Sequence, residues 1–116
     1  MVYFVESSKR AADVIRVNLT SLGITESFEI LQNETLRGIA DLERRAIAAD
    51  FIFLDPPYAM REAYARTLDA LANSGIGRTA VVIAEHEKRF DPGDTFGELR
   101  RTRKVSQGDA LSFYRS

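Results

Sequence analysis

Two hydrophobic periodicities alternate along this chain, and that alternation limits the folds open to it more than any other feature. Short, apolar, β-branched or aromatic segments typical of buried strands occupy residues 2–6, 28–32, 51–54 and 79–85. Segments with apolar residues at helical spacing lie between them, at residues 9–22, 35–49 and 60–72. Strands that alternate with helices indicate a parallel sheet covered by helices on both faces, so we predict an α/β fold.

The pattern changes after residue 85. The segment "RFDPGDTFGE" is rich in turn-forming residues, and "LRRTRKVSQ" and "DALSFYR" follow it with Gly108 between them. Both segments have strand character, which predicts a C-terminal antiparallel hairpin on an otherwise parallel sheet. A chain of 116 residues suits one domain with a modest core, so residues 1–116 are predicted to form a single domain.

Composition excludes several classes of site. The chain has no cysteine, which excludes disulfides, zinc–thiolate sites and thiol catalysis and fits a cytoplasmic location. The sole histidine, His86, has no second histidine or cysteine to complete a metal site, so we expect no metal and interpret His86 as part of a strand-end turn. The net charge of −1 does not by itself indicate a nucleic-acid-binding protein. No apolar run is long enough to span a membrane, and no signal-peptide pattern begins the chain.

The stretch "FIFLDPPYAM" places an acid, two prolines and a tyrosine directly after a predicted strand. Ligands of open α/β sheets bind beyond the carboxyl ends of the strands, where both Glu6 and Asp55 are expected. Pro56 and Pro57 stiffen the loop and leave its carbonyls free. The Asp55 carboxylate and the Pro56 carbonyl could accept both hydrogens of a nucleobase amine, while Tyr58 stacks on the base. The alternative is a helix-capping acid followed by a stiff turn.

These four residues match the [DNS]-P-P-[YFW] motif of S-adenosylmethionine-dependent amino-methyltransferases. The segments "VYFVESSKRAADVIRVNLTSLGI", "AVVIAEHEK" and "KVSQGDALSFYRS" resemble the second strand and helix, the fifth strand and the terminal hairpin of the bacterial 16S ribosomal RNA guanine-N2 methyltransferase family. The resemblance covers essentially the whole chain. It implies a Rossmann-like methyltransferase fold and methyl transfer to the exocyclic N2 of a guanine in 16S ribosomal RNA. Two alternatives remain, an adenine-N6 methyltransferase on DNA or RNA and a non-catalytic module that binds RNA or a partner chain.

The resemblance also implies roles for single residues. On the substrate side, Asp55 and Pro56 would be catalytic, and Pro57 and Tyr58 would bind a base that is flipped out or unpaired. Glu6 would hold the ribose hydroxyls of S-adenosyl-L-methionine, or else be a surface acid at a strand end. Asn33 would lie near the donor adenine, with a helix N-cap as the equal alternative because Glu34 departs from the family pattern.

The family begins with a strand and a glycine-rich loop of the form F-x-G-x-G, and the 116 residues contain no such segment. In the family that strand lies at the sheet centre, between the second and fourth strands. We therefore expect the segments around Phe4 and Phe53 to pair directly, with a homodimer or strand exchange as further responses to the vacant position. We also expect the 116-residue chain to bind S-adenosylmethionine weakly or not at all and to be inactive alone.

Four basic residues lie close together in the first strand of the predicted hairpin: Arg100, Arg101, Arg103 and Lys104. In an enzyme that acts on ribosomal RNA such a cluster could hold phosphates. Charges on an edge hairpin also block unwanted pairing between sheets. The sequence leaves both interpretations open.

Overall fold

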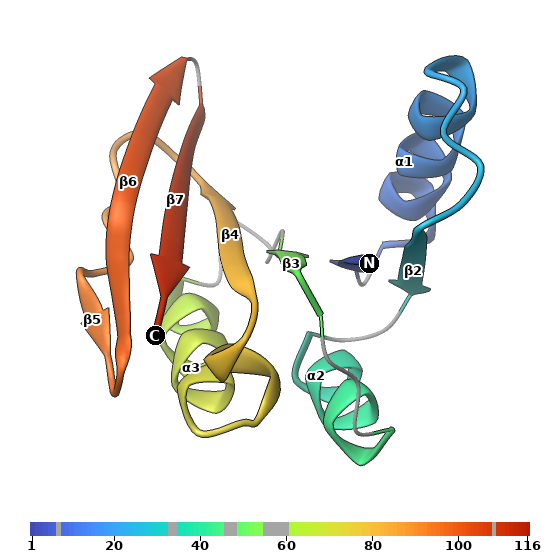
Figure 1. Cartoon of the computed structure of the whole chain (residues 1–116). Coiled ribbons are helices and arrows are strands. Elements are labelled where there is room, and N and C mark those ends of the chain that lie inside the picture. Colours follow the sequence, from blue (N-terminus) through green and yellow to red (C-terminus); the bar gives the residue numbers. More distant parts are fainter. Residues whose placement is uncertain (7, 33–34, 46–48, 55–60, 108) are drawn as a thin grey trace.

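The computed structural model describes residues 1–6, 8–32, 35–45, 49–54, 61–107 and 109–116. The chain alternates strand and helix as predicted, and its elements are β1 (Val2–Glu6), α1 (Lys9–Ser21), β2 (Phe28–Gln32), α2 (Thr35–Arg44), β3 (Phe51–Leu54), α3 (Arg61–Ala72), the 3₁₀ helix η1 (Ile76–Arg78), β4 (Val81–His86), β5 (Thr95–Phe96), β6 (Leu99–Gln107) and β7 (Asp109–Arg115). The seven strands of the described residues belong to one sheet, in the order β2-β1-β3-β4-β7-β6-β5 (Figure 1). The predicted α/β class is confirmed.

Strand β1 lies between β2 and β3 and is parallel to both. Phe4 is opposite Phe53, so the expected direct pairing of these two segments is confirmed. Strand β3 pairs in turn with β4, also in parallel. The carboxyl ends of β2, β1, β3 and β4 therefore meet at one edge of the sheet, which is the edge where ligands of open α/β sheets bind.

The C-terminal hairpin is confirmed as well. Strand β7 pairs antiparallel with β4 on one side and with β6 on the other. The register between β6 and β7 shifts between Arg101 and Arg103, which marks an irregularity in β6. The two-residue strand β5 pairs with β6 at the sheet edge and lies in the turn-rich segment, where the sequence predicted no strand.

The two faces of the sheet are covered unequally. Helices α2 and α3 lie on one face, where the core is formed by buried apolar residues that include Tyr3, Val5, Ile39, Leu42, Ile52, Leu54, Leu68, Leu71, Val82 and Ala84. Helix α1 lies on the other face, beside β1 and β2 (Figure 1). Only Ala12 of α1 is buried, whereas Val14 is 52% exposed and Leu22 is 74% exposed. The helical spacing predicted α1 correctly, but most of the apolar residues in and directly after it do not reach the core.

Local hydrogen bonds set the ends of several elements. Ser8 caps α1, and its Oγ accepts from the Ala11 N–H at 3.2 Å. Gly23 follows the end of α1 with a φ of 75°, a conformation that suits glycine. Strand β4 begins at residue 81 rather than 79, because the N–H groups of Thr79 and Ala80 both donate to the Ile76 carbonyl. Helix α2 ends at Arg44, earlier than its apolar pattern predicted.

Candidate functional site

Glu6 is the last residue of β1 and its side chain is only 5% exposed. Its Oε1 accepts from the Ser8 N–H at 3.0 Å. Its Oε2 is buried and has no hydrogen-bond partner among the described residues. Burying an acceptor without a partner costs about 1–3 kcal/mol, and such atoms are rare in folded proteins. Because Glu6 is buried, its interpretation as a surface acid is wrong.

The other predicted site residues lie outside the described part of the chain: Asn33, Asp55, Pro56, Pro57 and Tyr58. The strand ends that precede them are described. Glu6 is opposite Gln32 of β2, and Val5 is opposite Leu54 of β3. The residues next in sequence to Gln32 and Leu54 are Asn33 and Asp55, so both follow strands that end beside Glu6.

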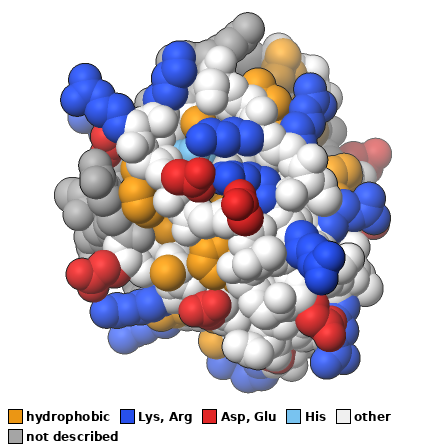
Figure 2. All heavy atoms as spheres, turned by 90° about the vertical axis from the view of Figure 1, so that its left-hand side faces the viewer, with side chains coloured by type: hydrophobic (Ala, Val, Ile, Leu, Met, Phe, Trp, Pro, Cys, Tyr) orange, Lys and Arg blue, Asp and Glu red, His pale blue; other side chains and the backbone are white. Residues whose placement is uncertain are grey.

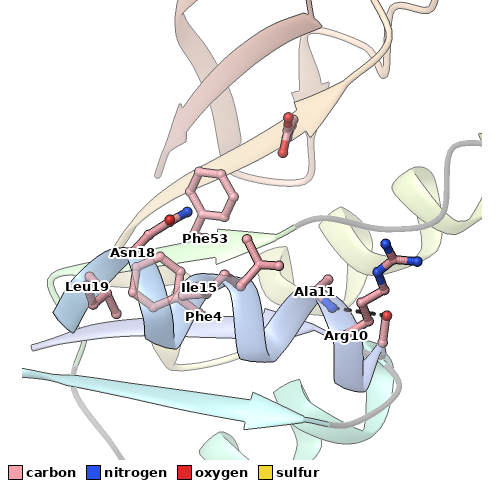
Figure 3. A pocket seen from close by; sticks show the side chains of 10 residues that line it. Phe4, Arg10, Ala11, Ile15, Asn18, Leu19 and Phe53 are labelled. Atoms are coloured by element: carbon pink, nitrogen blue, oxygen red, sulfur yellow. Dashed lines mark hydrogen bonds between the residues drawn. The ribbon is translucent and has the colours of Figure 1, made fainter. Parts of the chain in front are cut away.

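A groove of about 570 Å³ separates α1 from the sheet. It is lined by Phe4, Ser8, Arg10, Ala11, Val14, Ile15, Asn18, Leu19, Phe53 and Glu85, and we refer to it as the α1 groove. Figure 3 shows Phe4 and Phe53 on the strands, with Ala11, Ile15 and Asn18 on α1. The Phe4 and Phe53 ring centroids are 5.8 Å apart. Because Ser8 lines the groove and also donates to Glu6, the groove extends to the helix end beside the buried acid.

His86 ends β4 and is fully buried. Its Nδ1 is 2.9 Å from the Glu87 carbonyl, and its Nε2 is 2.7 Å from Ser112 Oγ on β7. A carbonyl can only accept, so Nδ1 carries a hydrogen and donates it to the Glu87 carbonyl. Ser112 Oγ in turn accepts from Arg101 at 3.4 Å. His86 thus connects β4 to β7, and no cluster of potential metal ligands occurs within the described residues.

The four basic residues of β6 differ in exposure and in the acidic groups that they contact. The Arg101 side chain is only 12% exposed and makes two bonds to the Asp91 carboxylate, at 2.7 and 3.1 Å, and another to Asp94. The hydrogen bonds that Asp91 accepts from Arg101 and from the Gly93 N–H hold the pKa of Asp91 well below its usual range. Lys104 Nζ lies 4.0 Å from Asp91. Arg101 therefore holds the loop that precedes β6 against that strand, through Asp91 and Asp94. Arg100 and Arg103 have exposed side chains.

Acidic and basic groups are interspersed over the side of the molecule that carries β5 and β6 (Figure 2). A surface of mixed sign attracts phosphates less strongly than a uniformly basic one. Sequence reasoning noticed the arginines but missed Ser112 and the acids that engage Arg101. No local signal could have identified them, since His86 and Ser112 are 26 positions apart.

The family model described as "Conserved hypothetical protein 95" matches residues 1–115. A curated relative from Bacillus subtilis, "Putative rRNA methyltransferase YlbH", is 27% identical over 105 residues, which are 90% of this chain and 57% of that protein. The chain therefore spans little more than half the length of this relative.

Two solved structures share the fold. A "conserved hypothetical protein" from Streptococcus pyogenes has a TM-score of 0.72 at 25% identity, over 97% of this chain and 69% of that one. The "Putative methyltransferase yhhF from Escherichia coli" has a TM-score of 0.66 at 18% identity, over 97% and 61% of the respective chains. With these neighbours, the mixed sheet, with four parallel strands and the antiparallel terminal hairpin, is a Rossmann-like fold of the methyltransferase type. Within the described residues, no helix has the length and hydrophobicity needed to cross a membrane.

Proposed function

The chain belongs to the family described as Conserved hypothetical protein 95, and we propose that it functions as an S-adenosyl-L-methionine-dependent methyltransferase. Its proposed substrate is the exocyclic N2 of a guanine in 16S ribosomal RNA, which places its work in the cytoplasm. The Asp-Pro-Pro-Tyr motif at residues 55–58 supports an amino-methyltransferase. The resemblance along the whole chain and the printed name of the Bacillus subtilis relative support ribosomal RNA as the substrate.

The observation that carries the proposal is the buried Oε2 of Glu6 at the carboxyl end of β1, which has no hydrogen-bond partner among the residues that the structure describes. In dinucleotide-binding folds an acid near a strand end accepts from the ribose hydroxyls. Here the Ser8 N–H holds Oε1, so that Oε2 remains to accept from a hydroxyl. Glu6 thus fits the ribose of S-adenosylmethionine, which supplies the methyl group when bound. Asn33, next after β2, is the proposed neighbour of the adenine.

The substrate side of the proposal rests on the motif that directly follows β3. The nitrogen of a guanine N2 amine is a poor nucleophile, because its lone pair is delocalised into the ring. The Asp55 carboxylate and the Pro56 carbonyl would accept its two hydrogens and favour a geometry in which the lone pair is exposed. Tyr58, carried on the stiff Pro57 loop, would stack on the base, a contact worth about 1–3 kcal/mol.

A second candidate is a non-catalytic, methyltransferase-like module that binds RNA or a partner chain. The direct pairing of β1 with β3 favours it, because in the resembled family another strand lies between them. An adenine-N6 methyltransferase is a third candidate, since its amine has the same two hydrogens.

The test is transfer of a tritiated methyl group to small-subunit ribosomal RNA by a form of the protein that includes a glycine-rich segment. We expect Asp55→Ala to abolish transfer, and activity within tenfold of the unmodified protein would refute the assignment. Tyr58→Ala should weaken RNA binding and leave donor affinity nearly unchanged. Nucleoside analysis of the product distinguishes N2-methylguanine from N6-methyladenine. RNA binding without any transfer would favour the non-catalytic module.

A further inference from the structure

Tyr64 connects the start of α3 to the end of β4. It lies in the first turn of α3, and its side chain is buried. Its hydroxyl donates to the Glu85 carbonyl at 2.8 Å. The last residue pair between β3 and β4 is Leu54 with Ala84. The accepting carbonyl therefore belongs to the first residue of β4 past that pair, at the edge of the sheet where ligands of open α/β sheets bind.

The Tyr64 ring packs in a cluster with two other rings. Its centroid is 5.2 Å from that of Phe90 and 6.4 Å from that of His86, which it meets edge to face. His86 and Phe90 also meet edge to face, at 6.5 Å. Aromatic pairs favour such contacts at about 4.5–7 Å. Because His86 is also bonded to Ser112 of β7, the cluster connects α3 to two neighbouring strands.

The segment between β3 and α3 begins with the Asp-Pro-Pro-Tyr motif. It consists of residues 55–60, and we call it the motif segment. The elements at its two ends determine where so short a segment can lie. Strand β3 is held at one end, because it pairs with β1 and with β4. Tyr64 holds the other end, because it fixes the first turn of α3 to β4.

We propose that Tyr64 is a positioning residue for methyl transfer, and that its hydroxyl sets the place of the motif segment by holding α3 to the end of β4. The inference rests on the proposed function, because that function assigns the motif to the substrate. Functional groups must be held closely by the packing and hydrogen bonds of the residues behind them. A misplacement of about 1 Å at the reacting groups is enough to lower a rate by roughly 100-fold.

Tyr64→Phe tests the hydroxyl alone, because phenylalanine keeps the ring contacts. Tyr114 offers a matched control. It is fully buried, and its hydroxyl also donates to a backbone carbonyl, that of Gly93, at 2.8 Å. Tyr114 lies in β7 and Gly93 in the loop before β5, so this bond does not involve α3. If Tyr64 served stability alone, Tyr64→Phe and Tyr114→Phe would behave alike.

The first test measures amide hydrogen exchange by mass spectrometry on the 116-residue chain, without donor or RNA. We expect Tyr64→Phe to speed exchange in residues 61–72 by about 10-fold or more, because the start of α3 opens more readily. Tyr114→Phe should speed exchange before β5 and leave residues 61–72 unchanged. Urea unfolding of all three proteins separates a local change from a loss of overall stability. Unchanged exchange of residues 61–72 in Tyr64→Phe would overturn the proposal.

The second test measures methyl transfer and donor binding in a form of the protein that includes a glycine-rich segment. We expect Tyr64→Phe to lower kcat by about 10- to 100-fold and to leave the donor dissociation constant unchanged. Tyr114→Phe should keep kcat within about twofold of the unmodified protein. Equal kcat values for the two variants would overturn the positioning role. If the unmodified protein transferred no methyl group, the proposed function would fail and this role with it, whereas the exchange data would still show whether the hydroxyl holds α3.

Discussion

Phe4 and Phe53 are opposite each other on adjacent parallel strands, with ring centroids 5.8 Å apart. The two residues make β1 and β3 direct neighbours at the middle of the parallel part of the sheet. Glu6 follows Phe4 by two positions, and the Asp-Pro-Pro-Tyr motif follows Phe53 by two. The direct pairing therefore determines how close the proposed donor and substrate elements approach each other.

The first prediction concerns donor binding by the 116-residue chain. We expect the 116-residue chain to bind S-adenosylmethionine with a dissociation constant in the millimolar range or weaker. The only charged group that we assign to donor binding is the Glu6 carboxylate, and one charge-assisted hydrogen bond contributes too little free energy for tighter binding. Isothermal titration calorimetry measures it directly. A micromolar constant would contradict the prediction and would require further donor-binding groups in this chain.

The second prediction concerns Glu6 itself. In a form of the protein that binds the donor, Glu6→Gln should weaken donor affinity by about 10- to 100-fold, since a charged acceptor for the ribose hydroxyls is lost. Oε1 of the glutamine can still accept from the Ser8 N–H, so the end of α1 should be retained. Glu26→Gln, at an exposed position, is the control and should bind like the unmodified protein. Unchanged affinity in Glu6→Gln would remove Glu6 from the donor site.

The third prediction concerns Asp91 and Arg101. The pKa of Asp91 is lowered in the folded chain, chiefly by its hydrogen bonds from Arg101, so the folded state favours the carboxylate. That stabilisation is fully present above the ordinary value of 3.8 and is lost as the pH falls from there toward the lower folded pKa. Because Asp91 is 54% exposed, solvent screening limits its contribution to about 1 kcal/mol.

Urea unfolding checks this. Asp91→Asn should lower the free energy of unfolding by about 1 kcal/mol at pH 7, and the difference from the unmodified chain should shrink below pH 4. The asparagine can still accept from the Gly93 N–H, which preserves the turn. Asp13→Asn, which removes an exposed ion pair with Arg16, should cost less than about 0.5 kcal/mol. A pH-independent loss in Asp91→Asn would show that the charge is not the cause.

The fourth prediction compares two glycines that are two positions apart. A Cβ at Gly77 would lie 2.1 Å from the Leu71 carbonyl oxygen, a backbone atom that cannot move without shifting the end of α3. Gly77→Ala should therefore destabilise the chain by about 1–3 kcal/mol or more. A Cβ at Gly75 would meet nothing within 4 Å, so Gly75→Ala should be neutral or stabilise by up to about 1 kcal/mol. Thermal unfolding of both variants tests the ranking, and equal midpoints would refute it.

Local pattern was enough to predict the element order, the parallel sheet, the C-terminal hairpin and the strand that precedes the Asp-Pro-Pro-Tyr motif. Periodicity of two or 3.6 residues is a property of adjacent positions, so it can be read without knowing the fold. Periodicity predicted the ends of elements less reliably, because single hydrogen bonds determine at which residue a helix or strand ends. Strand β4 begins two residues later than predicted, because the N–H groups of Thr79 and Ala80 donate to the Ile76 carbonyl in a 3₁₀ turn. No pattern in the sequence predicts this turn.

Contacts between distant positions were decided only by the tertiary structure. The sequence identified Glu6 as an acid at a strand end, but its burial depends on the elements packed around it. It could not distinguish Arg101, engaged by Asp91 and Asp94, from the exposed Arg103 two positions later. The sequence pattern predicted both Val14 and Ala12 as apolar residues of α1, although Val14 is half exposed and Ala12 is buried. A side chain's surroundings are set by residues far away in the chain, and local periodicity carries no information about them.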